Sequence, residues 1–201
     1  ILQRCLRQLP ERLLNIMLRL LAVTVLTLLT FSVANHAEAQ TPVSAQTANQ
    51  YYYNCKANQD PRMSAASQDA MCACNAAMMQ RNFTMEDMQL MLEDSYESRQ
   101  ALNAMLLNVY APCINFPLHD LLFDNCMSDR KVQRMRSTLP VEKFCGCVAE
   151  NTSEWMAKEG RNIMVDVIEQ NPNIYDPIEP IMNHKDFLAE AMRNRTVCAG
   201  G

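Results

Sequence analysis

Cysteine is the residue type in this chain whose spacing first suggests chemistry. The chain has 201 residues and nine cysteines, and eight of these fall into two sets of the same form: one cysteine, a Cys-x-Cys pair, and a last cysteine. Cys-x-Cys pairs can form disulfides, act as redox dithiols or bind soft metal ions. An even number of cysteines is what a disulfide framework requires. The two sets are Cys55, Cys72, Cys74 and Cys113, and then Cys126, Cys145, Cys147 and Cys198.

The Cys-x-Cys spacing favours disulfides to two different partners. Side chains two residues apart on a helix point about 200° away from each other, so a bridge within the pair has poor geometry. If each set closes on itself and both sets pair alike, two schemes remain: Cys55 and Cys126 bond either the first or the second cysteine of the pair that follows. The residue inside the pair, Ala73 or Gly146, is small enough to let neighbouring helices approach closely.

The alternative chemistry is thiol redox or copper binding. Thioredoxin-like catalysis uses Cys-x-x-Cys in a strand–helix setting, which the sequence does not show. Thioether sulfur selects Cu(I), and Met85, Met88 and Met91 recur every third residue, on roughly one face of a helix. The same methionines are also typical of a hydrophobic core or of an adaptable binding groove. Copper is therefore the cofactor of the alternative function only, and no cofactor is expected otherwise.

The elements that carry these residues are predicted to be helices throughout. No stretch shows the sustained alternation of a strand, and there are only four glycines. Thr84 followed by Glu86, and Pro140 followed by Glu142, are typical helix starts. The predicted helices span about 44–58, 64–81, 85–94, 97–110, 117–135, 140–158, 161–170 and 184–197. A three-proline loop, Asn171–Asn183, separates the last two.

The two sets of cysteines predict two tandem helical repeats, residues 40–116 and 117–201. Phe83 lies nine residues after the first Cys-x-Cys pair and Trp155 eight after the second, and an apolar helical pattern follows each. Duplication of one unit explains these matches. The fold class expected is therefore all-α, with two disulfide-stapled repeats packed on each other.

Residues 1–39 are predicted to be a signal peptide preceded by an extension that is not native. The uncharged run Leu20–Val33 follows Arg12 and Arg19 and precedes the small-x-small cleavage motif Ala37–Ala39. The run is shorter than the ~20 residues of a spanning helix, so no stable membrane span is expected after cleavage. Translation is predicted to start at Met17. Disulfides and a cleaved leader indicate a periplasmic or secreted protein.

The predicted function is that of an exported binding or structural module without catalytic activity. Acidic side chains outnumber basic ones, 22 to 18, which argues against nucleic acid as a partner. The partner expected is an unidentified protein or a small ligand, and the chain is expected to be a monomer or a homodimer. The loop Asn171–Asn183, which has no counterpart in the first repeat, is the predicted contact surface. Deleting it is predicted to abolish capture of the partner while leaving the fold intact.

The histidine pair and the alternative function remain to be described. The pair His119–Asp120 lies on a short amphipathic helix and is interpreted as a surface feature. The alternative function is a periplasmic copper-binding or thiol-redox protein that uses the Cys-x-Cys pairs or the methionines.

Overall fold

The computed structural model describes residues 40–134 and 139–200. The predicted signal peptide, its extension and the start at Met17 lie outside the described residues. The chain divides into two units, Ile1–Gln40 and Thr41–Gly201. All of the elements described below belong to the second unit.

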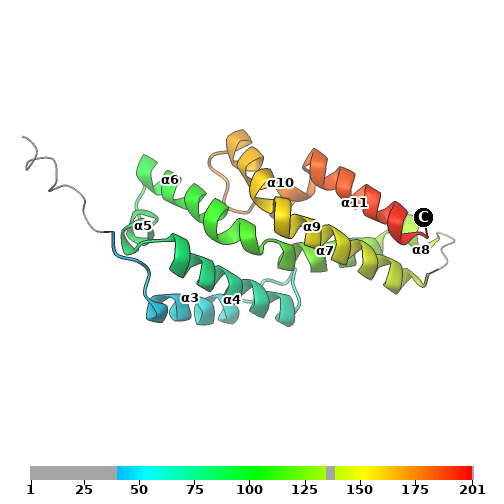
Figure 1. The fold of residues 1–201 in the computed structure, drawn as a ribbon, viewed down its shortest axis with the longest axis horizontal. Coiled ribbons are helices and arrows are strands. Elements are labelled where there is room, and N and C mark those ends of the chain that lie inside the picture. The colour runs from blue at the N-terminus through cyan, green and yellow to red at the C-terminus, as the bar shows by residue number, and fades with distance from the viewer. Residues whose placement is uncertain (1–39, 135–138, 201) are drawn as a thin grey trace, which may run out of the picture. The chain divides into compact units, whose positions relative to one another are not determined.

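The described residues of the second unit are built into helices, as the sequence predicts (Figure 1). In the described residues, strand-like pairing occurs only as an isolated bridge between Pro42 and Thr84. A π-helical turn, η2 (Leu106–Tyr110), and a 3-10 turn, η3 (Ala111–Cys113), lie between α6 (Tyr96–Met105) and α7 (Asn115–Ser128). None of the described helices is long and apolar enough to cross a membrane. The α-helices are α3 (Ala45–Ala57), α4 (Ala65–Asn82), α5 (Met85–Leu90), α6 (Tyr96–Met105), α7 (Asn115–Ser128), α8 (Arg130–Gln133), α9 (Val141–Gln170), α10 (Ile178–Met182) and α11 (Lys185–Cys198).

Side-chain caps explain where the first four of these helices begin. The hydroxyl oxygens of Ser44, Ser64, Thr84 and Ser95 each accept a backbone N–H from the first helical turn. At Thr84 the Asp87 carboxylate accepts the Thr84 N–H in return, which completes a capping box. Because each cap stabilises its helix by about 1 kcal/mol, the helix starts are specified locally by the sequence.

Four disulfides join neighbouring helices, and their pairing follows one of the two predicted schemes. The first cysteine of each set bonds the first cysteine of its Cys-x-Cys pair, and the second cysteine of the pair bonds the last of the set. Helix α4 is thereby bonded to α3 and η3, and α9 to α7 and α11. The bridges are Cys55–Cys72, Cys74–Cys113, Cys126–Cys145 and Cys147–Cys198.

The helix that carries each Cys-x-Cys pair also lies between the elements to which it is bonded. Helix α4 packs against α3 and against the turns η2 and η3, and α9 packs against α7 and α11. Contacts between α4 and α7, and between α9 and η3, join the two sets (Figure 1). The origin of these two similar arrangements by duplication stays a prediction.

Helix α9 differs from the two helices predicted at 140–158 and 161–170. It runs without a break from Val141 to Gln170 and passes through Gly160. A β-carbon added at Gly160 would lie 2.8 Å from Ile114 Cγ2 and 3.2 Å from the Ala111 carbonyl oxygen. Gly160 is therefore the point where α9 packs closely against η3 and the start of α7, and it does not end the helix.

Alanine at the two glycines of α9 should change stability in opposite directions. Gly160→Ala is expected to lower the free energy of unfolding by about 1–3 kcal/mol, because the methyl group overpacks a buried contact. Gly146→Ala is expected to raise it by about 0.5–1 kcal/mol, because nothing lies within 4 Å of an added β-carbon and alanine favours a helix. The expectation that Gly146 permits close helix approach is therefore wrong. Urea unfolding of both variants measures the two signs, and equal signs would contradict this packing.

The largest buried cluster lies among α7, α9, α10 and the start of α11, and the predicted contact loop is part of it. Ile174, Ile178 and Ile181 of that loop belong to the cluster, with side chains 7%, 3% and 0% exposed. The last two lie in the short helix α10, which was not predicted. Because the loop closes the core, its deletion is expected to unfold the protein, contrary to the sequence-based expectation that the fold would survive.

Candidate functional site

An apolar pocket lies between α6 with η2 and the segment Ile174–Pro177 of the predicted contact loop. Its volume is about 360 Å³, which is within the range of small-molecule sites. Apolar side chains make most of its wall, and the polar groups are few. We call it the α6–loop pocket, and it is lined by Leu102, Met105, Leu106, Tyr110, Ile174, Tyr175, Asp176, Pro177 and Arg62.

Two lining residues, Leu106 and Tyr110, come from the π-helical turn η2. The Ala111 N–H bonds the carbonyl oxygen of Leu106, five residues earlier, whereas an α-helix bonds the fourth. Pro112 follows at once and has no N–H, so the carbonyl groups of the preceding turn lose a donor. Such single π-helical turns frequently occur at functional sites. The sequence pattern predicts an ordinary helix over 97–110, and Pro112 is the signal that could have revealed the irregular turn.

Side chains from α4 and α9 supply the donors that Pro112 lacks. Arg161 Nη1 donates to the Leu107 carbonyl oxygen at 3.0 Å and to Asn108 Oδ1 at 2.9 Å. Asn82 Nδ2 donates to the Asn108 carbonyl oxygen at 2.8 Å. The wide turn is thus held by hydrogen bonds from two helices, and these bonds keep its lining residues in the pocket wall.

Arg62 joins the turn before α4 to the loop segment across the pocket. Its Nη1 lies 2.7 Å from Asp176 Oδ2, and its Nη2 lies 2.7 Å from Asp60 Oδ2. Hydrogen bonds from the Arg62 guanidinium hold the pKa of Asp60 below its ordinary value, against the opposing effect of burial. Arg62 therefore faces two carboxylates, and its positive charge is fully matched.

Two other polar groups, Tyr110 in the pocket wall and Arg99 beside the pocket, form no ion pair of this kind with the described residues. Burial raises the pKa of Tyr110, and the negative charge of Asp176 raises it further, so its hydroxyl stays protonated and can donate a hydrogen bond. Arg99 lies one turn before Leu102, with its Cζ 5.3 Å from the centre of the Tyr175 ring. Among the described residues, Arg99 Nη1 is buried and has no hydrogen-bond partner.

A larger cleft, of about 640 Å³, lies between α7 and α9 and contains His119. His119 Nε2 lies 3.5 Å from Glu150 Oε2, and its Nδ1 lies 3.2 Å from Asp120 Oδ1. Asp120 Oδ2 accepts the Ser64 N–H at the start of α4, at 2.8 Å. Burial alone would raise the pKa of Asp120, but hydrogen bonds from Ser64, Ser67 and His119 together hold it below its ordinary value. The pair His119–Asp120 thus links three helices, which is more than the surface feature that was expected.

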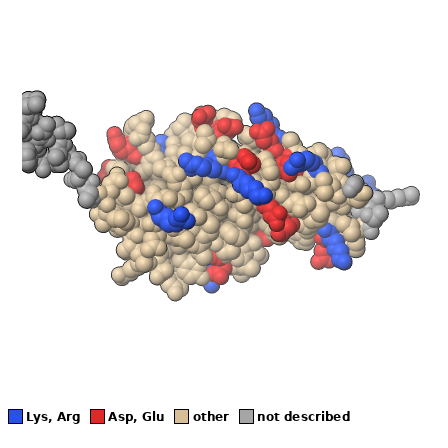
Figure 2. All heavy atoms as spheres, viewed as in Figure 1, with Lys and Arg blue, Asp and Glu red and all other residues tan. Residues whose placement is uncertain are grey.

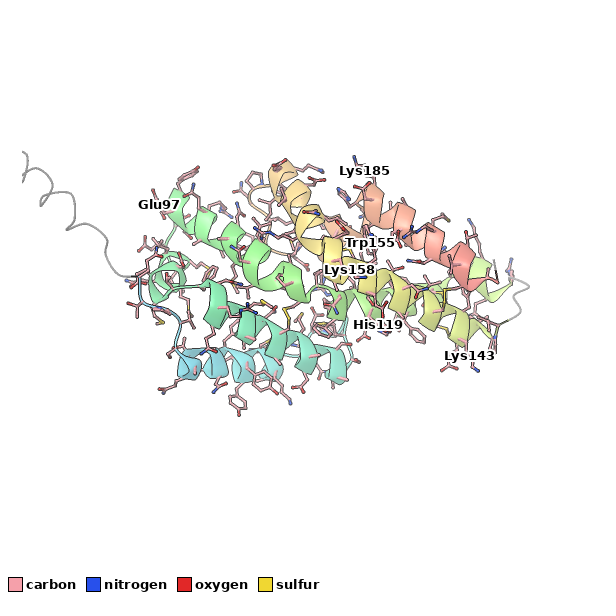
Figure 3. All side chains as sticks on the ribbon, in the orientation of Figure 1. Glu97, His119, Lys143, Trp155, Lys158 and Lys185 are labelled. Atoms are coloured by element: carbon pink, nitrogen blue, oxygen red, sulfur yellow. A yellow bond between two sulfur atoms is a disulfide. The ribbon has the colours of Figure 1, made fainter. Side chains whose placement is uncertain are left out.

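The charges around this cleft are mixed in sign. His119 and Lys158, both labelled in Figure 3, line it together with Glu150 and Glu154. Figure 2 shows the same mixture on the drawn face, where basic and acidic side chains adjoin and most of the surface is uncharged. The cleft is therefore a groove lined by charges of both signs and differs in kind from the α6–loop pocket.

Among the described residues, three potential metal ligands lie close together: Asp166, His184 and Asp186. His184 Nδ1 accepts the Asp186 N–H at 3.3 Å and so caps α11, which leaves the proton of the neutral ring on Nε2. His184 Nε2 lies 3.3 Å from Asp166 Oδ2, to which it donates. Since both ring nitrogens are engaged, the group is explained as a polar link between α11 and α9.

The residues of the predicted redox and copper chemistry are distributed over several elements. The two cysteines of each Cys-x-Cys pair bond different elements, and all eight cysteines in the described residues are in disulfides. Met88 and Met91 pack against the buried cluster that contains Phe83, whereas Met85 is 38% exposed. Helix α5 ends at Leu90, so the three methionines do not form one continuous helix face. Copper binding by these methionines stays a prediction.

The fold and bonds define a class: an all-α protein stapled by four disulfides, of the kind that persists in an oxidising environment. No protein-family model, curated protein or solved structure matches the chain.

Proposed function

We propose that this protein is a secreted or periplasmic binding module, and that the α6–loop pocket takes a small, largely apolar ligand. The observation that carries the proposal is the pocket's construction from an irregular π-helical turn and a loop that has no counterpart in the first set of helices. The disulfides are structural in this proposal, and no catalytic step is involved.

The chemistry of the pocket supports a ligand that is mostly hydrocarbon. Ligand sites are typically concave and apolar, with a small number of placed polar groups that fix orientation. The α6–loop pocket has this composition, since Leu102, Leu106 and Ile174 face it together with the polar groups of Arg62 and Tyr110. The His119 cleft is larger, but polar and charged side chains make most of its lining, among them the His119–Glu150 pair.

The rigidity of the walls also supports a preformed site. One wall is fixed by the hydrogen bonds of Asn82 and Arg161 to η2. The opposite wall is anchored in the core by Ile174 and by the Arg62–Asp176 ion pair. Preorganised walls reduce the entropy lost on binding, which favours affinity for a small ligand.

The test is a fluorescence titration with phenylnaphthylamine, an uncharged aromatic probe whose emission rises in apolar surroundings. The wild-type protein is expected to bind the probe saturably at one site. Leu102→Trp is expected to weaken binding by about tenfold or more, because the larger side chain fills the pocket and removes apolar area from the ligand's contact. Leu102 is partly buried and lies outside the main buried clusters, so the fold should tolerate the change.

The matched control places the same substitution on a surface that is not part of the pocket. Leu188 on α11 is 51% exposed, and Leu188→Trp is expected to leave the affinity for phenylnaphthylamine unchanged. If Leu102→Trp keeps its fold by circular dichroism and still binds as tightly as the wild type, the α6–loop pocket is not the site.

A further inference from the structure

Of two guanidinium groups that the described residues place near the α6–loop pocket, one is paired with carboxylates and the other is not. This difference helps to identify the ligand. Arg62 is matched by Asp60 and Asp176, each at 2.7 Å. Arg99 has no such partner: no ion pair joins it to a carboxylate of the described residues, and its Nη1 is buried without an acceptor. A guanidinium presents five N–H donors, and leaving one buried and unpaired costs about 1–3 kcal/mol.

The position of Arg99 places this unmatched cation beside the pocket. It lies one helical turn before Leu102, which lines the pocket, and its guanidinium stacks at 5.3 Å on the Tyr175 ring, which lines the opposite wall. The Tyr175 side chain is 72% exposed. Because little protein covers this ring, a ligand can displace it and reach the guanidinium.

A second donor points to the same ligand chemistry. Tyr110 lines the pocket and keeps its proton at neutral pH, so its hydroxyl can donate to an acceptor. An ionised ligand oxygen is a better partner for both Arg99 and Tyr110 than a neutral one, since hydrogen bonds to charged groups are about twice as strong.

We infer that the ligand of the α6–loop pocket is an anionic amphiphile, whose apolar body fills the pocket and whose carboxylate- or sulfonate-type oxygens pair with Arg99 and the Tyr110 hydroxyl. This inference rests on the proposed function, because it assigns the ligand class of the same site. It also accounts for the cation–π contact: the Tyr175 ring covers the Arg99 charge when no anion does.

Two fluorescent probes that share one aromatic skeleton test the inference. Anilinonaphthalene sulfonate carries a sulfonate that phenylnaphthylamine lacks. The wild-type protein should bind the sulfonate about tenfold more tightly than the neutral probe, which corresponds to one charge-assisted pairing. Arg99→Met keeps an unbranched apolar stem but removes the charge, and it should abolish this preference while changing the affinity for phenylnaphthylamine less than about twofold.

Two further variants complete the test: one controls for the change in net charge, and the other removes the second proposed donor. Arg81→Met alters the net charge of the protein by the same amount at an exposed position in the last turn of α4, and it should leave both affinities unchanged. Tyr110→Phe, which removes only the hydroxyl, should weaken binding of the sulfonate probe by about threefold and leave the affinity for the neutral probe unchanged.

The outcomes distinguish the inference from the proposed function. If neither probe binds saturably, the proposed function fails and the inference with it. If phenylnaphthylamine binds and Leu102→Trp blocks it, but Arg99→Met leaves the sulfonate preference unchanged, only the inference is overturned.

Discussion

Replacing Cys147 and Cys198 together with alanine should lower the free energy of unfolding by about 4 kcal/mol, because this bridge closes a segment of 51 residues. The loss is comparable to the whole stability of a small domain, whose free energy of unfolding is about 5–15 kcal/mol. Without the bridge, the last turn of α11 is expected to separate from the start of α9. Urea unfolding of the oxidised protein, followed by circular dichroism, measures the change.

The double variant of Cys55 and Cys72 provides the matched comparison. That bridge spans only 17 residues, so its removal should cost about 3 kcal/mol, roughly 1 kcal/mol less than the longer one. Replacing cysteines in pairs leaves no unpaired cysteine among the described residues that could exchange with the remaining bridges. A loss below about 1 kcal/mol for the longer bridge would show that α11 is held by packing and not by the disulfide.

Ile181→Ala is expected to lower the free energy of unfolding by about 2–5 kcal/mol. Ile181 is 0% exposed and lies in the largest buried cluster, so truncation leaves a cavity that the rigid helices around it cannot fill. The loop Asn171–Asn183 is thus part of the core as well as a wall of the α6–loop pocket. Thermal or urea unfolding checks the magnitude.

The control for this prediction is Tyr175, in the same loop. Its side chain is 72% exposed and its ring contacts the Arg99 guanidinium, so Tyr175→Ala should cost no more than about 1 kcal/mol. If Ile181→Ala were as mild as Tyr175→Ala, the loop would be separable from the core and its deletion would again be a useful test of binding.

The helices and their bonds were largely predictable, because local signals specify them. The hydroxyl caps and prolines mark helix starts, and the cysteine spacing reduced the possible pairings to two schemes. The choice between those schemes depends on which face of α4 and α9 meets each neighbour, and that is a property of tertiary packing. The continuity of α9 through Gly160 was missed because glycine is a weak helix former, and only its contact with η3 shows why it is there.

The α6–loop pocket could be predicted only in part. The proline-rich loop was identified as the distinctive surface, but its buried isoleucines and the helix α10 were not. The opposite wall was not predicted, because its sequence pattern is typical of an ordinary helix. The π-helical turn η2 depends on Pro112 together with hydrogen-bond donors from Asn82 and Arg161. Those donors lie far apart in the sequence, so no local pattern links them to the turn.

The most direct test of the central claim is an NMR titration of the isotope-labelled protein with phenylnaphthylamine. The account predicts that the largest changes in amide chemical shift occur in η2 and in the segment Ile174–Pro177, and that they saturate together. Largest changes around His119 and Lys158, or no changes at saturating probe, would contradict the assignment of the α6–loop pocket as the ligand site.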